Sequence, residues 1–299
     1  MTFRKGADYS ARSNTRTGGG GRGGTIAAGG GIGSLLLIGL FLLMGGNPGD
    51  LGGLVGGGQS NQGQVESAQD SDALAHCNSA ESANKYAECR VQFAAKSVDD
   101  VWTNVLPAEA GIDYVQGGLV IFQDTTQSGC GYASAQTGPF YCPADQSSYF
   151  DVSFFNQLEQ MGGDNAPLAQ MYIVAHEFGH HIQQLEGTLS LSNYNEPGED
   201  SNAVKIELQA DCYAGLWAHH ADEGEDAFLE KITDEQVRSA IDTARAVGDD
   251  NIQRRSGGEV RPDQWTHGSS EQRQNAFLTG YREGTMASCD TLERGVYNS

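Results

Sequence analysis

The sequence predicts an α+β fold, in which a helical bundle stands beside a small antiparallel or mixed β-sheet and follows one apolar N-terminal segment. Two stretches, 165–186 and 205–217, have the apolar pattern of buried helices. Three short stretches between residues 118 and 151 are rich in the β-branched and aromatic residues typical of strands. Residues 26–44 carry no charge and approach the roughly 20 apolar residues that cross a bilayer.

The N-terminal part of the chain is expected to anchor the globular domain. The first 46 residues hold five basic residues and one acidic residue, a net charge of 5 − 1 = +4, so the remainder carries −21 − 4 = −25. A basic head before an apolar run predicts a span whose N-terminus is cytoplasmic. We therefore expect a disordered basic cytoplasmic head (1–24), a transmembrane anchor (25–46), a Gly/Gln/Ser-rich linker (47–71) and one globular domain (72–299).

The rival interpretation of the apolar run is a cleaved signal peptide with its apolar core at Leu35–Met44. No A-x-A-like cleavage site follows, because residues 45–49 read Gly-Gly-Asn-Pro-Gly, and an uncleaved anchor is favoured. The expected location is the bacterial inner membrane, crossed once, with the globular domain in the periplasm or outside the cell. The net charge of −21 argues against nucleic acid as a partner.

Local signals place the first elements of the globular domain. A helix is expected at 83–95, and a second begins at Ser97 as N-cap and ends at Pro107. Strands are expected at 118–122, 140–142 and 148–151.

Further signals place the helices that follow. Asp151 is a candidate cap for a short helix that Gly162-Gly163 ends. Asn165-Ala166-Pro167 opens a helix that ends before Gly187. The polar loop 190–201 is either a rim beside a site or only a connection. Thr233 to Gln236 fits a capping box for a helix that runs to Val247, with Gly248 at its end.

The six cysteines favour disulfides, because the count is even and the domain is expected to be exported. No C-x₂-C pair is present to suggest a cysteine zinc site. The sequence does not fix the connectivity. Pairing sequence neighbours gives Cys77–Cys89 and Cys130–Cys142, and leaves Cys212 with Cys289, which would tie the C-terminus back to the core.

The motif His-Glu-x-x-His occurs at residues 176–180 within the first of the two apolar helices. His176 and His180 lie four residues apart, on one face of the helix, and can present two imidazoles to one Zn²⁺. Glu177 lies about 100° round the helix, where it can act as the general base of metal-assisted peptide hydrolysis. His181 points away from this face and is not expected to be a ligand.

A catalytic zinc site needs a third protein ligand, and the second apolar helix offers Glu207. Asp211 is four residues further on and shares its face. Two carboxylates on a buried face repel each other unless a cation or hydrogen-bond donors neutralise them. Zinc on Glu207 would do so, and Asp211 could then orient a zinc-bound imidazole. The plain alternative is a solvated acidic pair on an amphipathic helix.

His-Glu-x-x-His followed by Glu-x-x-Ala-Asp resembles the gluzincin metallopeptidases, including the membrane-associated prenyl-protein and heat-shock types. More closely, the chain resembles the bacterial putative neutral zinc metallopeptidase family over nearly all of residues 72–299 and the N-terminal apolar segment. The matching stretches are Gly138–Asp145, His176–His181, Glu207–Gly215 and Trp265–Ser270. The resemblance implies a zincin-like metallopeptidase domain with one Zn²⁺ per chain on His176, His180 and Glu207, and Asp211 beside the ligands.

The C-terminal third holds three further candidates. Thr266-His267, six residues before Arg273, is similar to the Thr-His-Pro…Arg segment of the heat-shock and prenyl types, with Gly268 replacing the proline. The resemblance implies that His267 acts in catalysis and that Arg273 supports the ligands. His267 and Tyr281 are both candidate donors to the oxyanion of the reaction. The alternatives are a structural histidine for His267 and core packing for Tyr281.

Two functions from different classes follow. The first is a membrane-anchored zinc endopeptidase that acts on peptide or protein substrates, with an extended substrate pairing with the edge of the sheet. The second is a membrane-anchored binding or assembly module with a structural or latent zinc site. The intact Glu177 favours the enzyme, because a structural site has no use for a general base.

His219-His220 lie about 18 Å along the helix from Glu207, too far to share its metal, and are expected to be a solvated helix end.

Overall fold

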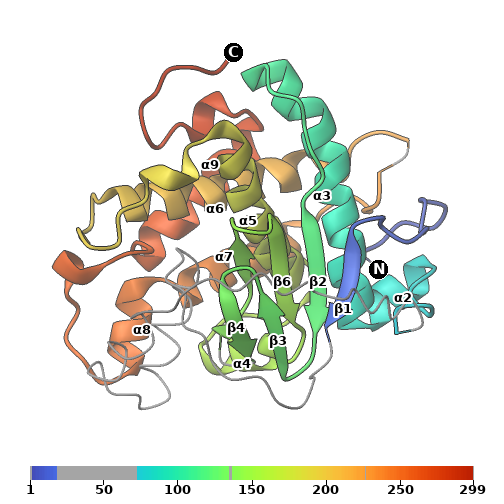
Figure 1. Ribbon diagram of the computed structural model, residues 1–299, viewed down its shortest axis with the longest axis horizontal. Coiled ribbons are helices and arrows are strands. Elements are labelled where there is room, and N and C mark those ends of the chain that lie inside the picture. The colour runs from blue at the N-terminus through green and yellow to red at the C-terminus, as the bar shows by residue number, and fades with distance from the viewer. Residues whose placement is uncertain (1, 19–72, 135–136, 226, 299) are drawn as a thin grey trace.

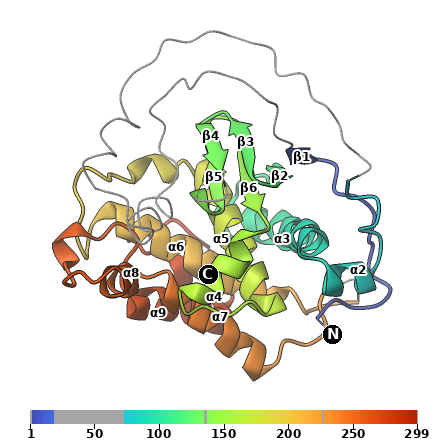
Figure 2. The same cartoon turned by 90° about the horizontal axis from the view of Figure 1, so that it is seen from below.

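The computed structural model describes residues 2–18, 73–134, 137–225 and 227–298, and it has the expected α+β architecture (Figure 1). Figure 2 shows the strands on one side of the molecule and the helices gathered on the other. The helices of the described residues are α2 (Ala80–Lys85), α3 (Ala87–Ala110), α4 (Phe154–Gln160), α5 (Pro167–Glu186), α6 (Asn202–His220), α7 (Asp234–Ala246), α8 (Asp249–Arg255) and α9 (Ser270–Glu283). The fully buried Trp102, Tyr172 and Trp217 mark the core between α3, α5 and α6.

The main sheet is mixed and has the order β1 (Thr15–Gly18), β2 (Gly118–Phe122), β6 (Ser147–Asp151) and β5 (Phe140–Cys142). The first three strands run parallel, and β5 is antiparallel to β6. The three strands predicted from the sequence are confirmed. Two more strands, β3 (Thr125–Ser128) and β4 (Gly131–Ser134), pair as a separate hairpin. Strand β5 is therefore an edge strand, and with β6 it packs against α5.

Helix α3 is continuous where the sequence predicts two helices. Ser97, the expected N-cap, is buried in its middle, where the Ser97 hydroxyl accepts a hydrogen bond from the Trp217 indole N–H at 3.1 Å. The helix also continues past Pro107, because a proline in the last turn removes only one backbone hydrogen bond. It ends at Gly111, which has φ +67° and donates to the Pro107 carbonyl. Tertiary burial overrode the capping signal of Ser97, whereas the exposed Pro107 is tolerated because it lies in the last turn.

The other predicted helix ends are only partly correct. The capping box of Thr233 and Gln236 is present at the start of α7, but Gly248 begins α8 instead of trailing α7. The N-cap of α4 is Ser153, and Asp151 instead accepts a hydrogen bond from the Ser153 backbone N–H at 2.8 Å. Gly187 ends α5 with φ +73°, as expected.

Helices α6 and α9 pack backbone against backbone through two glycines. A Cβ at Gly280 would lie 1.9 Å from the Cys212 carbonyl oxygen, and one at Gly215 would lie 2.0 Å from the Phe277 carbonyl oxygen. No larger residue fits without moving one helix. This close approach brings the first turn of α9 to the centre of α6.

All three expected disulfides are present, and they use every cysteine in the chain. Cys77–Cys89 joins the segment before α2 to α3, with Cα atoms 5.0 Å apart, and Cys130–Cys142 closes the loop from β4 to β5. Cys212–Cys289 ties the C-terminal segment to α6 across 77 residues of sequence. The third bond removes the most freedom from the unfolded chain, because it closes the longest loop.

Residues 2–18 form an arm that packs along the globular domain, which differs from the disordered head expected at 1–24. Strand β1 extends the sheet beside β2, and Phe3 is fully buried. Arg12 is also buried, and its guanidinium donates to both Asp99 carboxylate oxygens at 2.7 and 2.9 Å and to the Gly117 carbonyl at 2.8 Å. The arm is polar and basic in sequence, and its order is explained by strand pairing with β2, the burial of Phe3 and the buried ion pair of Arg12 and Asp99.

No helix in the described ranges is long and apolar enough to cross a membrane. The expected anchor (25–46) and linker (47–71) lie outside the described residues. The arm (residues 2–18) and the globular domain that follows from residue 73 pack on each other. In this arrangement both occupy the same compartment.

We predict that Arg12→Met destabilises the protein by about 3–5 kcal/mol, because it leaves Asp99 as a buried carboxylate without its counter-charge. Adding Asp99→Asn should recover part of this loss, since the uncompensated charge is then gone. Urea unfolding of the two single variants and the double variant measures the coupling. A loss below about 1 kcal/mol for Arg12→Met would show that the arm is not docked in solution.

Candidate metal centre

His176 and His180 on α5 and Glu207 on α6 meet at one point. The Nε2 atom of His176 lies 3.3 Å from Oε2 of Glu207, and the Nε2 atom of His180 lies 3.6 Å from Oε1. One ligand atom from each of the three residues lies within 4.8 Å of the others, and all three side chains are buried. The structure thus brings together the three residues that the sequence selected as ligands.

Gly179 allows α6 to come close enough for this meeting. A Cβ at Gly179 would lie 3.1 Å from both the Cα and the carbonyl oxygen of Ala210. A glycine inside a helix costs about 1 kcal/mol relative to alanine. In return the two helices approach closely, and Glu207, one turn before Ala210, reaches the imidazoles.

Asp211 connects the first ligand to α9. Its Oδ1 lies 2.8 Å from Nδ1 of His176, and Arg273 donates to its two oxygens at 2.7 and 2.9 Å. The Tyr172 hydroxyl also donates to it. Burial alone would raise the pKa of Asp211, but the charges of Arg273 and His176 lower this pKa to about 2. The carboxylate therefore stays ionised and holds His176 with Nε2 facing the other ligands.

The electrostatics of this cluster require a cation. Burial opposes a charge on His176, but Asp211 and Glu207 together raise the His176 pKa to about 10. Without a metal, a proton on His176 therefore supplies the positive charge. Two imidazole nitrogens and one carboxylate oxygen are a donor set that suits Zn²⁺ and leaves a fourth position open. The residues fit this ion, whose binding would displace the proton.

Glu177 lies beside the ligands and not among them. It is buried, and the Tyr141 backbone N–H on edge strand β5 donates to its carboxylate. Burial raises the pKa of Glu177 to about 7, and the nearby Glu207 contributes in the same direction. A carboxylate with this pKa is suited to accept and return a proton near neutral pH.

His267 is held in a turn by Asp249, the first residue of α8. Oδ2 of Asp249 accepts hydrogen bonds from the backbone N–H groups of Thr266, His267 and Gly268 at 2.8, 2.7 and 3.1 Å, and Oδ1 lies 3.1 Å from Nδ1 of His267. Gly268 has φ +88° and uses its N–H in this turn. Proline cannot adopt a positive φ and has no backbone N–H to donate, which explains why a glycine stands at this position.

The other ring nitrogen of His267, Nε2, is buried and has no hydrogen-bond partner among the described residues. Burial lowers the pKa of His267, but Asp249 and then Glu207 raise it above the ordinary value. The ring is therefore close enough to Glu207 to feel its charge, and Nε2 is free to donate to a bound molecule. Sequence analysis missed Asp249, whose signal is its position at the start of a helix.

Tyr194 is a second residue that sequence analysis missed. It lies in the polar loop 190–201, and burial together with the charges of Glu207 and Glu177 raises the pKa of Tyr194. Its phenol is therefore near enough to both carboxylates of the site to feel their charge, which favours the interpretation of the loop as a rim beside the site. The only advance signal was the position of this loop between the two ligand-bearing helices.

Tyr281 does not reach the ligands. It stacks on Phe277, and its backbone carbonyl lies 2.8 Å from Nδ1 of His219, at the far end of α6. Its charged neighbours are Asp222, Asp234 and Lys231. The physical reason is helix length, because Tyr281 lies eight residues, about 12 Å, beyond Arg273 along α9.

The remaining histidines of the two helices have other partners. His181 contacts the Tyr141 hydroxyl at 3.0 Å and the Val115 carbonyl at 2.7 Å, on the face of α5 away from the ligands. His219 and His220 lie at the end of α6, where they contact the backbone carbonyls of Tyr281 and Gly284. Neither group takes part in the cluster around Glu207.

Comparison with known proteins agrees with this geometry. The family described as "Putative neutral zinc metallopeptidase" matches residues 2–292. The chain is 41% identical over 225 residues to "Uncharacterized protein Rv2575" of Mycobacterium tuberculosis, which covers 73% of this chain and 75% of that protein. It is 36% identical over 205 residues to "Uncharacterized protein YpfJ" of Escherichia coli K12, with 67% and 69% covered. No solved structure matches the chain significantly.

We predict that Glu177→Gln stabilises the metal-free protein, and increasingly so as the pH rises. Its pKa of about 7 lies above the ordinary value of 4.5, so the folded wild type binds this proton more tightly than the unfolded chain and loses stability between these two pH values. The loss approaches about 3 kcal/mol above pH 7, and glutamine avoids it.

Urea unfolding with a chelator present, at pH 5 and pH 8, measures the stability of each protein. The difference between the two proteins isolates Glu177, because both share every other titrating group. A difference that does not change between pH 5 and pH 8 would contradict the assigned pKa.

Proposed function

The chain belongs to the bacterial neutral zinc metallopeptidase family, and on that premise we propose that it is a zinc-dependent endopeptidase. The observation that carries the proposal is the position of Glu177, a buried carboxylate beside a cluster of two histidines and a glutamate. A metal ion on His176, His180 and Glu207 would polarise water and the scissile carbonyl as a Lewis acid.

Glu177 moves the proton in this mechanism. Because the pKa of Glu177 is about 7, its carboxylate can accept a proton from the attacking water as the water oxygen bonds to the carbonyl carbon. It then returns this proton to the amide nitrogen, and the C–N bond breaks to give a carboxylic acid and an amine. The Tyr141 N–H keeps the Glu177 carboxylate oriented meanwhile.

His267 and Tyr194 are placed to stabilise the charge that develops on the carbonyl oxygen. The free Nε2 of His267 and the phenol of Tyr194 both lie near Glu207, on segments outside the two ligand helices. Donors fixed in advance in a site shielded from water stabilise an oxyanion more than mobile solvent does. Asp249 fixes the direction of the His267 ring.

The substrate is proposed to be an extended peptide segment. Strand β5 is the sheet edge nearest the site, and its residue Tyr141 touches Glu177 through its backbone. An extended chain can add to such an edge through backbone hydrogen bonds, which do not depend on sequence. This favours unfolded or exposed segments of proteins as substrates.

The alternative, a binding or assembly module with a structural or latent zinc site, gains no support from the described residues. A structural site would close the fourth position with another protein ligand. It would also have no use for the buried carboxylate of Glu177, which destabilises the fold when ionised.

We predict that Glu177→Gln retains one zinc ion per chain and loses hydrolysis by roughly 10²–10⁴-fold, because the proton carrier is gone while the ligands remain. Metal content is measured by elemental analysis, and activity by cleavage of a fluorescently labelled unfolded protein. Wild type stripped by a chelator and reloaded with zinc is the positive control. A zinc-loaded variant that cleaves as fast as wild type would rule out this mechanism.

The same assay tests the two proposed donors. His267→Ala and Tyr194→Phe should each lower kcat by roughly 10²-fold or more with a smaller effect on KM, because they act mainly as the oxyanion forms. Tyr281→Phe is the matched control, because Tyr281 lies away from the ligands, and it should behave as wild type.

We also propose that residues 25–46 anchor the chain in the bacterial inner membrane with the catalytic domain on the outer side. A single span would place the arm and the domain in different compartments, so the Arg12–Asp99 pair could not form within that chain. Docking of the arm and a single span are therefore alternative states of one molecule.

Cysteines at two touching positions distinguish these states. Ser13 and Gln116 lie side by side, with Oγ and Oε1 2.7 Å apart, and the native cysteines are all paired. The chain carries both Ser13→Cys and Gln116→Cys and is treated with a maleimide that does not cross the membrane. With a single span, both cysteines should react after lysis, whereas the cysteine at position 13 should be protected in intact cells. Formation of a disulfide between them in cells would contradict the single span and favour arm and domain on the same side.

A further inference from the structure

We infer that a buried chain of amide hydrogen bonds, running from His180 through Gln183 and Gln209 to the Cys289 carbonyl, fixes the second histidine ligand for metal binding. The Cys212–Cys289 disulfide holds the far end of this chain and thereby sets the metal affinity of the site. Gln183 and Gln209 are positioning residues in this scheme. The inference rests on the proposed zinc site and goes beyond the reaction itself.

The links of this amide relay are hydrogen bonds between buried groups. Nδ1 of His180 lies 2.8 Å from Oε1 of Gln183, and Nε2 of Gln183 donates to Oε1 of Gln209 at 3.0 Å. Nε2 of Gln209 donates in turn to the Cys289 carbonyl oxygen at 3.2 Å. Both glutamine side chains are completely buried, so water cannot replace a lost partner.

The direction of every link is fixed by groups that can only accept hydrogen bonds. The second N–H of Gln183 donates to the Ile206 carbonyl at 2.7 Å, so its amide nitrogen must face α6. The Cys289 carbonyl fixes the amide of Gln209 in the same way. Oε1 of Gln183 therefore faces His180 and accepts from its Nδ1. This leaves the lone pair on Nε2, which faces Glu207, for a metal ion.

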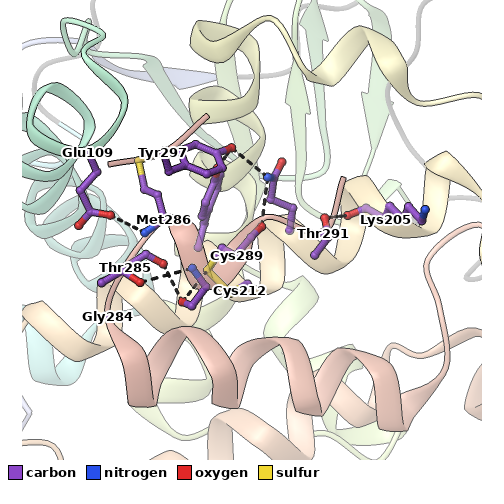
Figure 3. Close-up of a disulfide and its surroundings, with 12 residues drawn as sticks. Glu109, Lys205, Cys212, Gly284, Thr285, Met286, Cys289, Thr291 and Tyr297 are labelled. Atoms are coloured by element: carbon purple, nitrogen blue, oxygen red, sulfur yellow. Dashed lines mark hydrogen bonds between the residues drawn. A yellow bond between two sulfur atoms is a disulfide. The ribbon is translucent and has the colours of Figure 1, made fainter. Parts of the chain in front are cut away.

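The disulfide is the anchor of the relay's far end. Cys289 ends a short 3₁₀ turn, Ala287–Cys289, and bonds to Cys212, the residue after Asp211 on α6. Figure 3 shows the two cysteines with Tyr297 and Thr291 beside them, and the Thr291 hydroxyl donates to the Lys205 carbonyl at 2.7 Å. Tyr297 adds a hydrogen bond at 3.3 Å from Nε2 of Gln209. The covalent bond is the strongest of these attachments to α6.

The two histidine ligands are therefore positioned by separate means. His176 is held by the charged Asp211–Arg273 pair, whereas His180 depends on neutral amides and on a segment joined through the disulfide. Loss of the disulfide lets the Cys289 carbonyl move and frees Gln209 to turn. Gln183 then keeps only the Ile206 carbonyl as a fixed acceptor, so His180 is held less firmly, while His176 keeps its own partner.

Zinc dissociation constants, measured by competition with a chelating indicator, test the inference. The variants are Gln183→Leu, Gln209→Leu and the Cys212→Ser/Cys289→Ser pair, and each should bind zinc roughly 10–100-fold more weakly than wild type. The matched control is the Cys77→Ser/Cys89→Ser pair, which removes a disulfide elsewhere and should bind zinc as wild type does. Combining Gln209→Leu with loss of the Cys212–Cys289 bond should cost no more than the larger single effect, because both break one relay.

A second measurement does not depend on the folding of the cysteine variants. Nitrogen-detected NMR of the zinc-loaded wild type should show His180 with its proton on Nδ1, because Oε1 of Gln183 accepts from that atom. Variants that all bind zinc as tightly as wild type, or a His180 proton on Nε2, would overturn the relay and leave the proposed function intact. A wild type that binds no zinc would overturn both.

Discussion

The close approach of three helices is the constraint on which the rest of this structure depends. Gly179 brings α5 against Ala210 of α6, and Gly215 and Gly280 bring α6 against α9 with carbonyl oxygens where side chains would otherwise stand. Only at this spacing do two imidazoles from α5, a carboxylate from α6 and a guanidinium from α9 meet inside one core. Each glycine weakens its own helix, so the arrangement is retained against local preference.

Charge explains why these side chains stay buried. Asp211 and Glu207 are carboxylates inside an apolar bundle, and they are tolerated because the positive charges of Arg273 and His176 lie against them. Around Glu177, burial outweighs the charges of His176 and Arg273 and raises the Glu177 pKa to about 7. The same interior therefore stabilises the ionised form of one carboxylate and penalises that of its neighbour, which separates a structural role from a proton-transfer role.

The two ends of the chain are both part of the fold. The arm at residues 2–18 extends the sheet through β1, and the C-terminal segment is fixed to α6 by Cys212–Cys289. The family match begins at residue 2, so the arm lies inside the region that the family shares. Arg12 lies over the Phe178 ring of α5, with the guanidinium carbon 5.1 Å from the ring centre, so the arm touches the helix that carries two ligands. The N-terminal arm therefore contacts one ligand-bearing helix, and the C-terminal segment is joined to the other.

The sequence by itself determined the elements whose signals are local or chemically narrow: His176, Glu177 and His180 at helical spacing, Glu207 and Asp211 on one face, and the three strands. Prediction from the sequence failed where a contact with a residue far away in the chain decides the local structure. Ser97 lies in the middle of α3 because Trp217 and the core bury it, Tyr281 lies too far along α9, and Arg12 is held by Asp99 and by the Gly117 carbonyl, which are distant in the sequence. Tyr194 and Asp249 had only weak positional signals, and the glutamines behind His180 had none, since a loop tyrosine or a buried amide has no periodicity of its own. Local sequence sets which residues can bind a metal ion or move a proton. Only tertiary packing sets which of these residues lie together in one buried site, because that depends on contacts between residues far apart in the chain.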